Sequence, residues 1–562
     1  MIITGLIPMI YFTYFNYPYM RYNITLESKD GTELSGWLYL PSPAPSSAAP
    51  IPGIVVTHGF TSSKVSMQGY SIEFVKRGFV VVAIDYRGHG MSDGYLDSRR
   101  YTNESPLIDD IMAGVKYLRN LNYVDKKSIA ILGHSMGGIT AIQAGAMYPD
   151  EINATISIGA ILNPDHGEGT VNVSLISNFM IGIGGYEELF TIEAGLNFMK
   201  NYTGIADPKP NTLYGNFTYG NATELVVSPS SDHILEISDK NLIESSVEWL
   251  ENAFYGGVRY PITITEKYRS VAMLTTLLGV LISIFSIVAY SRKAFFKSKP
   301  LIYDIQEISS EIELSPARSN TEKMKVIVFY ALLYISGTSF GLLLEIPFSY
   351  IFESTVLKVM SSLFIAIFLG LACGLFLIYF LIHRFFEHKK TPLLLTIYNR
   401  LTRNFRKSTS MGLIIFFYLF SFLVLTFQIG ALNVVLTIRD LGAFIAIGLL
   451  IAPYFLISEL LIRQFQDKLN IKNRFTNWII TSVIISLIKI SVFIPLLFMG
   501  LGFVTLMIAI LVGLLPVMEI FSNWTYIYSD RNPLTPAIFS WLFMTWFLTF
   551  LMPFGTITYS LF

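Results

Sequence analysis

AILGHSMGGI, residues 130–139, is the most informative stretch of this sequence. It joins a short apolar run to the pentapeptide GHSMG and then to a segment rich in small residues. GHSMG fits the pattern G-x-S-x-G between a predicted strand and a predicted helix, which is the context of a serine held on a sharp turn. The glycines leave room for strand and helix to approach, and the helix start favours negative charge at the Ser135 hydroxyl. Ser135 is therefore the candidate nucleophile.

Strands and helices alternate on both sides of this stretch. Strands are predicted at 22–41 (a hairpin), 52–60, 80–94 (with a glycine-rich loop), 128–135 and 154–160, and helices at 71–79, 105–121 and 136–149. Such alternation indicates a mostly parallel sheet with helices on both faces. The sequence thus predicts an α/β fold for its first half.

Three segments carry a family resemblance. They are THGF (57–60), DYRGHGMSDG (85–94) and GHSMGG (133–138). Together they resemble the oxyanion segment, the D-x-R-G-x-G-x-S loop and the nucleophile elbow of the α/β-hydrolase superfamily of serine hydrolases. The resemblance covers residues 22–255 and implies the α/β-hydrolase fold there.

The resemblance also implies an acid and then a histidine after the serine. Of the seven histidines, His166 and His233 follow the elbow and precede the membrane half. The segment 224–254 resembles the family's last strand, histidine loop and final helix, so we expect His233 to be the catalytic base. His166 remains the alternative.

The acid is expected in the segment 177–198, which is similar to the family's strand, turn and helix around its catalytic acid. Glu187 stands where the family usually has aspartate, and glutamate is an accepted variant. Glu188, Asp165 and Asp207 remain alternatives.

The implied reaction uses no metal ion and no organic cofactor. His233 takes the proton of Ser135 as the serine attacks a carbonyl carbon, and water later releases the acyl-enzyme. The backbone N–H groups of Phe60 and Met136 are expected to stabilise the oxyanion, in the manner of the family.

The composition of the whole chain is that of a membrane protein. Of its 562 residues 52% are apolar and 14% charged, and the mean hydropathy is +0.52. The formal net charge is zero, so nothing points to nucleic acid. A single cysteine, Cys373, excludes disulfides within the chain and thiolate metal clusters.

Apolar stretches long enough to cross a bilayer fill the second half. Eight are predicted, at 271–290, 326–345, 358–382, 411–436, 442–462, 477–497, 500–521 and 537–559. Alternate connections between them are basic, namely 291–299, 384–390, 400–407 and 463–474. Because cytoplasmic loops carry an excess of Lys and Arg, we place these loops in the cytoplasm and the first half outside the cell.

The predicted organisation has three parts. Residues 1–20 form an N-terminal transmembrane anchor, 21–256 an extracellular α/β-hydrolase domain, and 265–562 an all-α transmembrane bundle of about eight helices. Lys489, inside a predicted span, is either a functional group or a side chain that snorkels or pairs within the bundle.

Asn-x-Ser/Thr triplets crowd the first half. They occur at Asn23, Asn103, Asn153, Asn172, Asn201, Asn216 and Asn221. Glycans need an external face, so we predict glycosylation at some of these sites. The host is then a eukaryote or an archaeon, and the low cysteine content favours an archaeon.

The sequence predicts a multi-pass, membrane-anchored serine hydrolase of the esterase or lipase type, acting on an ester, lipid or acylated peptide. One alternative is a serine peptidase of the prolyl-oligopeptidase or aminopeptidase type. Another is a transporter or signalling protein whose hydrolase fold only binds. The expected partners are the ester, lipid or peptide substrate and the lipid bilayer, with no nucleic acid.

Overall fold

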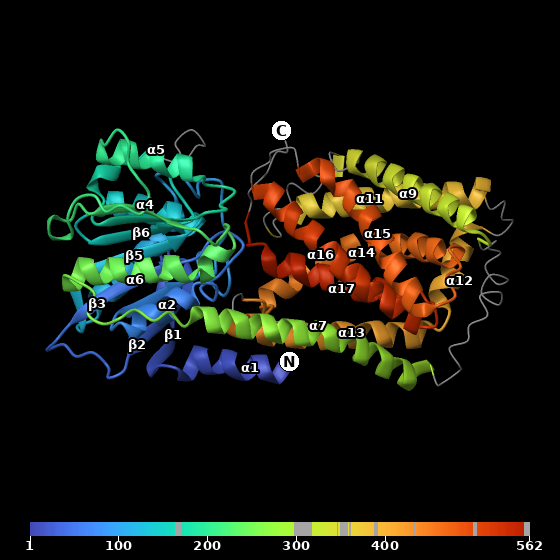
Figure 1. Ribbon diagram of the computed structural model, residues 1–562, viewed down its shortest axis with the longest axis horizontal. Helices are drawn as coiled ribbons and strands as arrows, with labels where there is room; N and C mark the ends of the chain where they lie inside the picture. Colours follow the sequence, from blue (N-terminus) through green and yellow to red (C-terminus); the bar gives the residue numbers. More distant parts are fainter. Residues whose placement is uncertain are drawn as a thin grey trace. The chain divides into compact units, whose positions relative to one another are not determined.

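The computed structural model describes residues 1–162, 170–296, 317–344, 347–348, 358, 361–386, 392–430, 433–497 and 503–555 (Figure 1). The described chain packs as two compact units. The first comprises Met1–Leu278 with described residues of 424–437 and 550–555, and the second Gly279–Leu423 and Ile438–Thr549.

An eight-stranded sheet forms the centre of the first unit. Its strands are β1 (Tyr19–Glu27), β2 (Glu33–Pro41), β3 (Ile51–Thr57), β4 (Val80–Ile84), β5 (Val124–His134), β6 (Ala154–Ile158), β7 (Phe179–Gly184) and β8 (Thr223–Ser228). They lie in the order β1-β2-β4-β3-β5-β6-β7-β8, with β2 antiparallel to β1 and β4 and all later neighbours parallel. The predicted α/β fold is confirmed.

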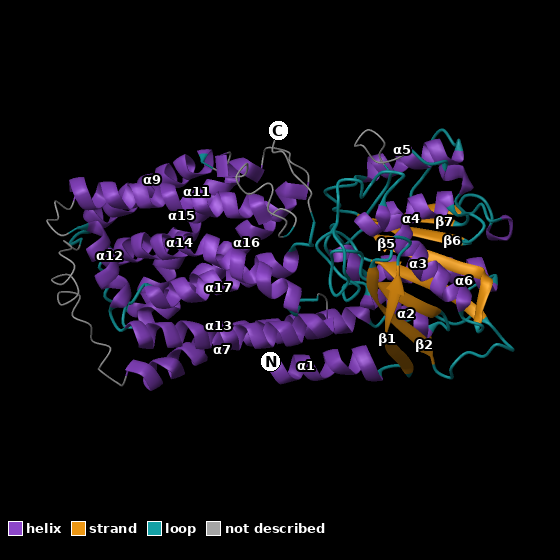
Figure 2. Cartoon of the chain, turned by 180° about the vertical axis from the view of Figure 1, so that it is seen from behind, coloured by secondary structure: helices purple, strands orange, loops and turns teal. Residues whose placement is uncertain are grey.

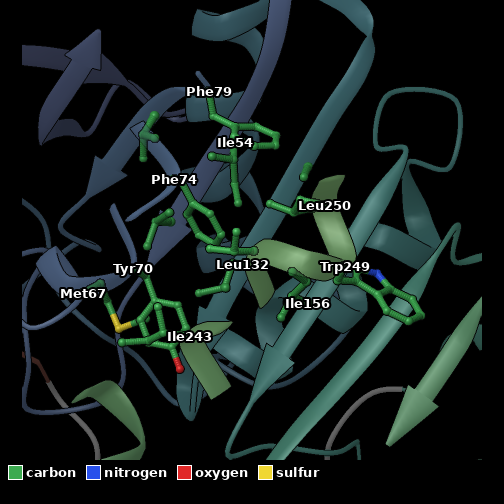
Figure 3. Close-up of a cluster of buried hydrophobic side chains, with 14 of the residues drawn as sticks. Ile54, Met67, Tyr70, Phe74, Phe79, Leu132, Ile156, Ile243, Trp249 and Leu250 are labelled. Carbon is green, nitrogen blue, oxygen red and sulfur yellow. The ribbon is translucent and has the colours of Figure 1, made fainter. Parts of the chain in front are cut away.

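Helices cover both faces of this sheet (Figure 2). They are α2 (Gln68–Lys76), α3 (Pro106–Asn120), α4 (Met136–Met147), α5 (Ile192–Thr203) and α6 (Lys240–Tyr255). Figure 3 shows Phe74 of α2 and Trp249 of α6 packed with Ile54 and Leu132 of the central strands. A second cluster joins α4 and α5 to β7 and β8. Burying one such side chain contributes about 1.5–3 kcal/mol, so the two layers fix the strand ends that carry the site.

A short apolar helix, α1 (Ile2–Ile10), continues through a π-helical turn, Tyr11–Phe15, and packs inside the first unit. A Cβ atom at Gly5 would lie 2.3 Å from Thr276 Oγ1, so only a glycine permits this approach to α7 (Glu266–Phe296). Phe12 stacks on Tyr268 with ring centroids 5.4 Å apart. Whether the segment crosses a bilayer remains a prediction.

Long apolar helices make up the rest of the described chain. Eight are long and apolar enough to cross a membrane: α7, α9 (Asn320–Leu343), α11 (Ser361–Leu381), α13 (Phe405–Gly430), α14 (Ile438–Lys468), α15 (Arg474–Leu497), α16 (Phe503–Tyr528) and α17 (Leu534–Leu551). Each overlaps one predicted span, which confirms the all-helical second half. A short helix, α12 (Leu393–Thr402), lies in what the sequence predicted as a connection.

Two helices end more than five residues before their predicted spans do. α13 ends at Gly430 rather than 436, and α17 ends at Leu551 rather than 559. After α17 the chain leaves the helix and binds the loop that follows β4: Phe554 N–H donates to Gly88 O (2.8 Å), and Leu96 N–H donates to Phe554 O (2.8 Å). Hydropathy measures composition alone, so it does not distinguish such an apolar non-helical segment from the helix before it.

Two glycine pairs bring α9 and α11 into close contact. A Cβ atom at Gly374 would lie 1.8 Å from Gly337 O, and one at Gly341 would lie 2.4 Å from Gly370 O. Each helix thus carries a G-x-x-x-G pattern on the face that meets the other, as in tightly packed membrane helices.

Buried charges inside the second unit are paired. Arg463, fully buried, donates to Glu459 (2.7 Å) and Glu519 (3.0 Å), and Lys489 Nζ donates to Glu519 (2.8 Å). Ser522 accepts from Arg463 at 2.6 Å and donates to Glu459 at 3.0 Å. Lys489 therefore pairs within the bundle, in a cluster whose two cations and two carboxylates cancel.

Candidate active site

Ser135 stands on a sharp turn between β5 and α4. Its φ of 53° and ψ of −117° are unusual for a residue with a side chain, and such angles gather at functional sites. A Cβ atom at Gly133 would lie 2.0 Å from Gly137 O, and one at Gly137 would lie 2.7 Å from His58 O. Both glycines of the G-x-S-x-G pattern are therefore needed for the backbone to close around the serine.

The structure brings Ser135, His233 and Glu187 into one hydrogen-bonded chain. Ser135 Oγ is 2.9 Å from His233 Nε2, and Glu187 Oε2 is 2.8 Å from His233 Nδ1. An ionised carboxylate only accepts, so Nδ1 carries the imidazole proton and Nε2 is left to accept from the serine hydroxyl. This is the arrangement required to withdraw a proton from Ser135.

Glu187 follows β7 in a turn that supplies it with donors. Its Oε1 accepts from the N–H groups of Leu189 (2.7 Å) and Phe190 (3.2 Å). Burial raises the pKa of Glu187, but the hydrogen bond and charge of His233, with the Leu189 amide, outweigh it and bring the pKa below its ordinary value. The carboxyl group is thus ionised at neutral pH.

The other candidates for the acid and the base fall elsewhere. Glu188 accepts from the backbone N–H of His233 (3.3 Å) rather than from the imidazole. Asp207 has a side chain that is 80% exposed and pairs with Lys209. Asp165 and His166 lie outside the described residues.

The segment that carries Phe60 is shaped by His58. The fully buried His58 accepts from Tyr86 N–H through Nε2 (3.1 Å), so its Nδ1–H donates to Gly59 O (2.8 Å). Burial lowers the pKa of His58, which keeps this tautomer neutral. A Cβ atom at Gly59 would lie 3.1 Å from Ser135 Cβ, so this backbone passes directly beside Ser135.

Asp85 ties that segment to the loop after β4. Its carboxylate accepts from the N–H groups of Lys64 (2.7 Å) and Met91 (3.0 Å) and pairs with the Lys64 ammonium. Burial raises the pKa of Asp85, but Lys64 and His58 outweigh it and the pKa is lowered. On the other side of Ser135, Met136 is the first residue of α4, where the first N–H groups have no acceptor within the helix.

His134 and Glu236 also belong to the site. The ring centroid of His134 is 5.0 Å from that of His233, and its Nε2 lies 3.1 Å from His233 O. Glu236 follows in the turn Leu235–Ser238, and its buried carboxyl accepts from Gly184 N–H (2.6 Å). The residue inside the elbow faces the site because β5 and β8 end at the same edge of the sheet.

Burial sets the protonation of these two residues. It lowers the pKa of His134 well below its ordinary value, so this imidazole is neutral. It raises the pKa of Glu236 well above its ordinary value, and the nearby Glu187 charge raises it further. His134, His233 and Glu236 offer ligand atoms within 4.8 Å of one another, but a metal ion there would compete for the imidazole that binds Ser135 and Glu187.

The predicted glycosylation sites differ in accessibility. Six asparagines are exposed, namely Asn23, Asn103, Asn172, Asn201, Asn216 and Asn221. Asn153 is half-buried, and its side-chain oxygen accepts from Ile129 N–H (3.3 Å). Glycosylation itself remains a prediction.

Known proteins resemble the first half of the chain. Residues 48–183 match the model of the family described as serine aminopeptidase, S33. The chain is 31% identical over 124 residues to a monoacylglycerol lipase of Mycolicibacterium smegmatis, which covers 22% of this chain and 42% of the lipase. It is 30% identical over 128 residues to a polyketide transferase of Stachybotrys chlorohalonatus, which covers 23% of this chain and 40% of the transferase.

A longer alignment joins the chain to YfhR of Escherichia coli, with 24% identity over 42% of this chain and 84% of that protein. The chain covers 40% of the length of the polyketide transferase from Stachybotrys chlorohalonatus and 49% of the length of the one from Aspergillus fumigatus. A solved esterase of Pyrococcus furiosus aligns at 20% identity and a TM-score of 0.31, over 42% of this chain and 93% of the esterase. The family match at 48–183 and the strand order of the sheet together make the N-terminal region an α/β-hydrolase domain.

Proposed function

We propose that the protein is a membrane-bound serine hydrolase that cleaves ester or acyl bonds through Ser135, His233 and Glu187. The observation that carries this proposal is the continuous hydrogen-bonded chain from Ser135 Oγ through both nitrogens of His233 to Glu187. Such a chain on a strained elbow favours an enzyme over a module that only binds.

In the proposed reaction His233 Nε2 takes the hydroxyl proton as Ser135 Oγ attacks the carbonyl carbon of the substrate. The resulting oxyanion accepts from the backbone N–H groups of Phe60 and Met136. Glu187 stabilises the imidazolium, which then gives its proton to the leaving group, and a water molecule activated by the same imidazole releases the acyl group. Losing one oxyanion donor would cost about 2.7–4 kcal/mol of transition-state stabilisation.

An acyl ester is the substrate class that we favour. The ring of Phe190 lies 6.2 Å from that of His233, which puts an apolar wall beside the nucleophile. The relatives named as a lipase and an esterase act on such bonds by their names. A peptidase is the second candidate, because the matching family is described as serine aminopeptidase.

The hydrolase domain faces the exterior in this proposal. The first unit takes in the start of α7, described residues between α13 and α14, and residues after α17. In a chain that crosses a bilayer with each of the eight helices, these three points fall on one side, and the basic connections fall on the other. The positive-inside rule then puts the hydrolase outside.

Covalent labelling tests the enzyme. A fluorophosphonate probe should label the full-length protein, and Ser135→Ala should abolish labelling while His233→Ala slows it by orders of magnitude. Fresh wild-type protein that has not met the probe would then be given chromogenic esters, lipids and aminoacyl amides. Faster turnover of amides would favour the peptidase, and absence of any labelling would leave only the binding module.

Cysteine labelling tests the location. In a Cys373→Ala background, an impermeant maleimide added to intact cells should label Asp207→Cys, at an exposed site of the hydrolase domain, but not Lys472→Cys, at an exposed site between α14 and α15. The opposite pattern would put the hydrolase domain in the cytoplasm.

A further inference from the structure

Glu236 is a buried carboxyl group that the triad leaves unexplained. Its side chain is fully buried, and a Cβ atom at Gly159 would lie 1.9 Å from its Oε2, so a glycine makes room for it. Oε2 lies 3.3 Å from His134 Nε2 and 3.9 Å from His233 Nδ1. Glu236 is therefore a neighbour of the imidazole that contacts Ser135.

Hydrogen bonding decides which carboxyl group holds a proton. Both carboxyl groups approach the same nitrogen, because Glu187 Oε2 lies 2.8 Å and Glu236 Oε2 3.9 Å from His233 Nδ1, and two ionised carboxylates crowded there would repel each other. Glu187 accepts from His233 Nδ1, Leu189 N–H and Phe190 N–H. Glu236 Oε1 accepts from Gly184 N–H, whereas its buried Oε2 accepts no hydrogen bond among the described residues. The three donors favour the charge on Glu187, and the proton belongs on Glu236.

The remaining neighbours of Glu236 agree with a neutral side chain. His134 from β5 is neutral and directs its Nε2–H at His233 O. Tyr70 of α2 donates to the backbone carbonyl of Glu236 (3.0 Å), not to its carboxyl group. Asp239 adds a negative charge nearby, which opposes ionisation, as does Glu187, while burial raises the pKa most.

We propose that Glu236 is a positioning residue: its carboxyl group stays in the acid form and donates a hydrogen bond to Glu187, which fixes that carboxylate against His233 Nδ1. The proposal rests on the proposed serine hydrolase function. It also explains why a second carboxyl group is tolerated there. A second ionised carboxylate within 3.9 Å of Nδ1 would instead compete with Glu187 for the one hydrogen that this nitrogen carries.

Two variants of the full-length protein test the role in catalysis. Glu236→Gln keeps a neutral donor of the same shape, and Glu236→Leu removes the donor at similar volume. We expect Glu236→Leu to lower kcat roughly 10- to 100-fold with little change in KM, the usual effect of losing a hydrogen bond to a charged group. Glu236→Gln should recover most of that loss, and the acidic limb of its kcat/KM profile should stay where the wild type has it.

Two results would overturn the proposal. One is a Glu236→Leu variant with wild-type kcat. The other is an acidic limb that moves to lower pH in Glu236→Gln, because that shift means that the wild type carries a negative charge at this position. Thermal unfolding shows whether both variants are folded. If Glu236→Leu is not folded, the kcat/KM profile of Glu236→Gln against pH tests the proposal alone.

An infrared measurement separates this proposal from the proposed function. At neutral pH the wild type minus Glu236→Gln difference spectrum should contain the carbonyl stretch of a protonated carboxyl group. A wild type that has this band but hydrolyses no ester or amide contradicts the hydrolase function and leaves the protonated Glu236 standing. Absence of the band contradicts the role of Glu236 whatever the activity.

Discussion

Two groups of buried ionisable side chains differ in their charge balance, namely those at the sheet edge around His233 and those in the helix bundle around Arg463. In the bundle, Arg463 and Lys489 meet Glu459 and Glu519, and the charges cancel. At the sheet edge, Glu187 and Glu236 converge on a histidine and no lysine or arginine pairs with either among the described residues. An internally neutral cluster serves packing, whereas an unbalanced one leaves a base ready to accept a proton.

Glu187→Gln should have the largest effect. An amide in place of the carboxylate favours the wrong imidazole tautomer and leaves the imidazolium unstabilised, so kcat should fall by about 10³- to 10⁴-fold with the fold intact. Ester hydrolysis and probe labelling measure this, with Glu193→Gln on the exposed first turn of α5 as control. A comparable loss in Glu188→Gln, with Glu187→Gln active, would reassign the acid.

Arg463→Met should damage stability rather than chemistry. It leaves Glu459 and Glu519 buried with one fewer cation, and breaking a buried pair in this way costs about 3–5 kcal/mol. Thermal unfolding in detergent measures the loss, and the exposed Lys472→Met in the same half should stay within about 0.5 kcal/mol of wild type. An unchanged unfolding temperature for Arg463→Met would mean that the cluster is not structural.

Gly374→Leu should separate α9 from α11. A side chain there meets the backbone of Gly337, and forced overpacking typically costs about 1–3 kcal/mol. Gly513→Leu is the matched control, because a Cβ atom at Gly513 meets nothing within 4 Å among the described residues. Equal unfolding temperatures for the two variants would contradict the close helix contact.

Glu236→Gln should change how stability depends on pH. The folded state raises the pKa of Glu236 above its unfolded value, so the wild type loses stability as pH rises from about 4, the pKa of a free glutamate, through the folded pKa. Glutamine does not titrate, so the variant should gain unfolding temperature relative to wild type as the pH rises. Glu187, with its lowered pKa, acts in the opposite direction equally in both proteins. A difference that stays constant with pH would argue against a neutral Glu236.

Removing a predicted glycosylation site should affect stability least. In a host that glycosylates, the exposed Asn216 should carry a glycan and the half-buried Asn153 should not. Peptide mass spectrometry after glycosidase treatment shows whether each of the two sites carries a glycan. Asn216→Gln should change the unfolding free energy by less than about 0.5 kcal/mol. A glycan on Asn153, or none on any exposed site, would contradict the prediction.

Much of the first unit was predictable because local chemistry and topology agree there. The alternation of apolar runs with helical spacing predicted the parallel sheet, and the pentapeptide GHSMG predicted the turn at Ser135. Glu187 was predictable from its place after β7, and the structure hydrogen-bonds it to His233.

The features that the sequence did not predict depend on contacts between residues far apart in the chain. Glu236 lies in SDHILEISD (231–239), where a carboxylate is typical of the residues that precede a helix. Its approach to His233 depends on the turn Leu235–Ser238. The contact of His134 with His233 was not predictable, because it depends on the loop after β8 lying next to the turn at Ser135. The two G-x-x-x-G patterns, GTSFG (337–341) and GLACG (370–374), were visible in the sequence and would have predicted the pairing of α9 with α11.

The hydrogen bonds between Phe554 and the loop at Gly88 and Leu96 make the first unit discontinuous in sequence. They join residues more than 450 positions apart in the chain, so they form only after nearly all of it has been synthesised. Although most of the first unit is encoded at the start of the chain, a protein truncated before Phe554 would lack these contacts at the loop that follows β4.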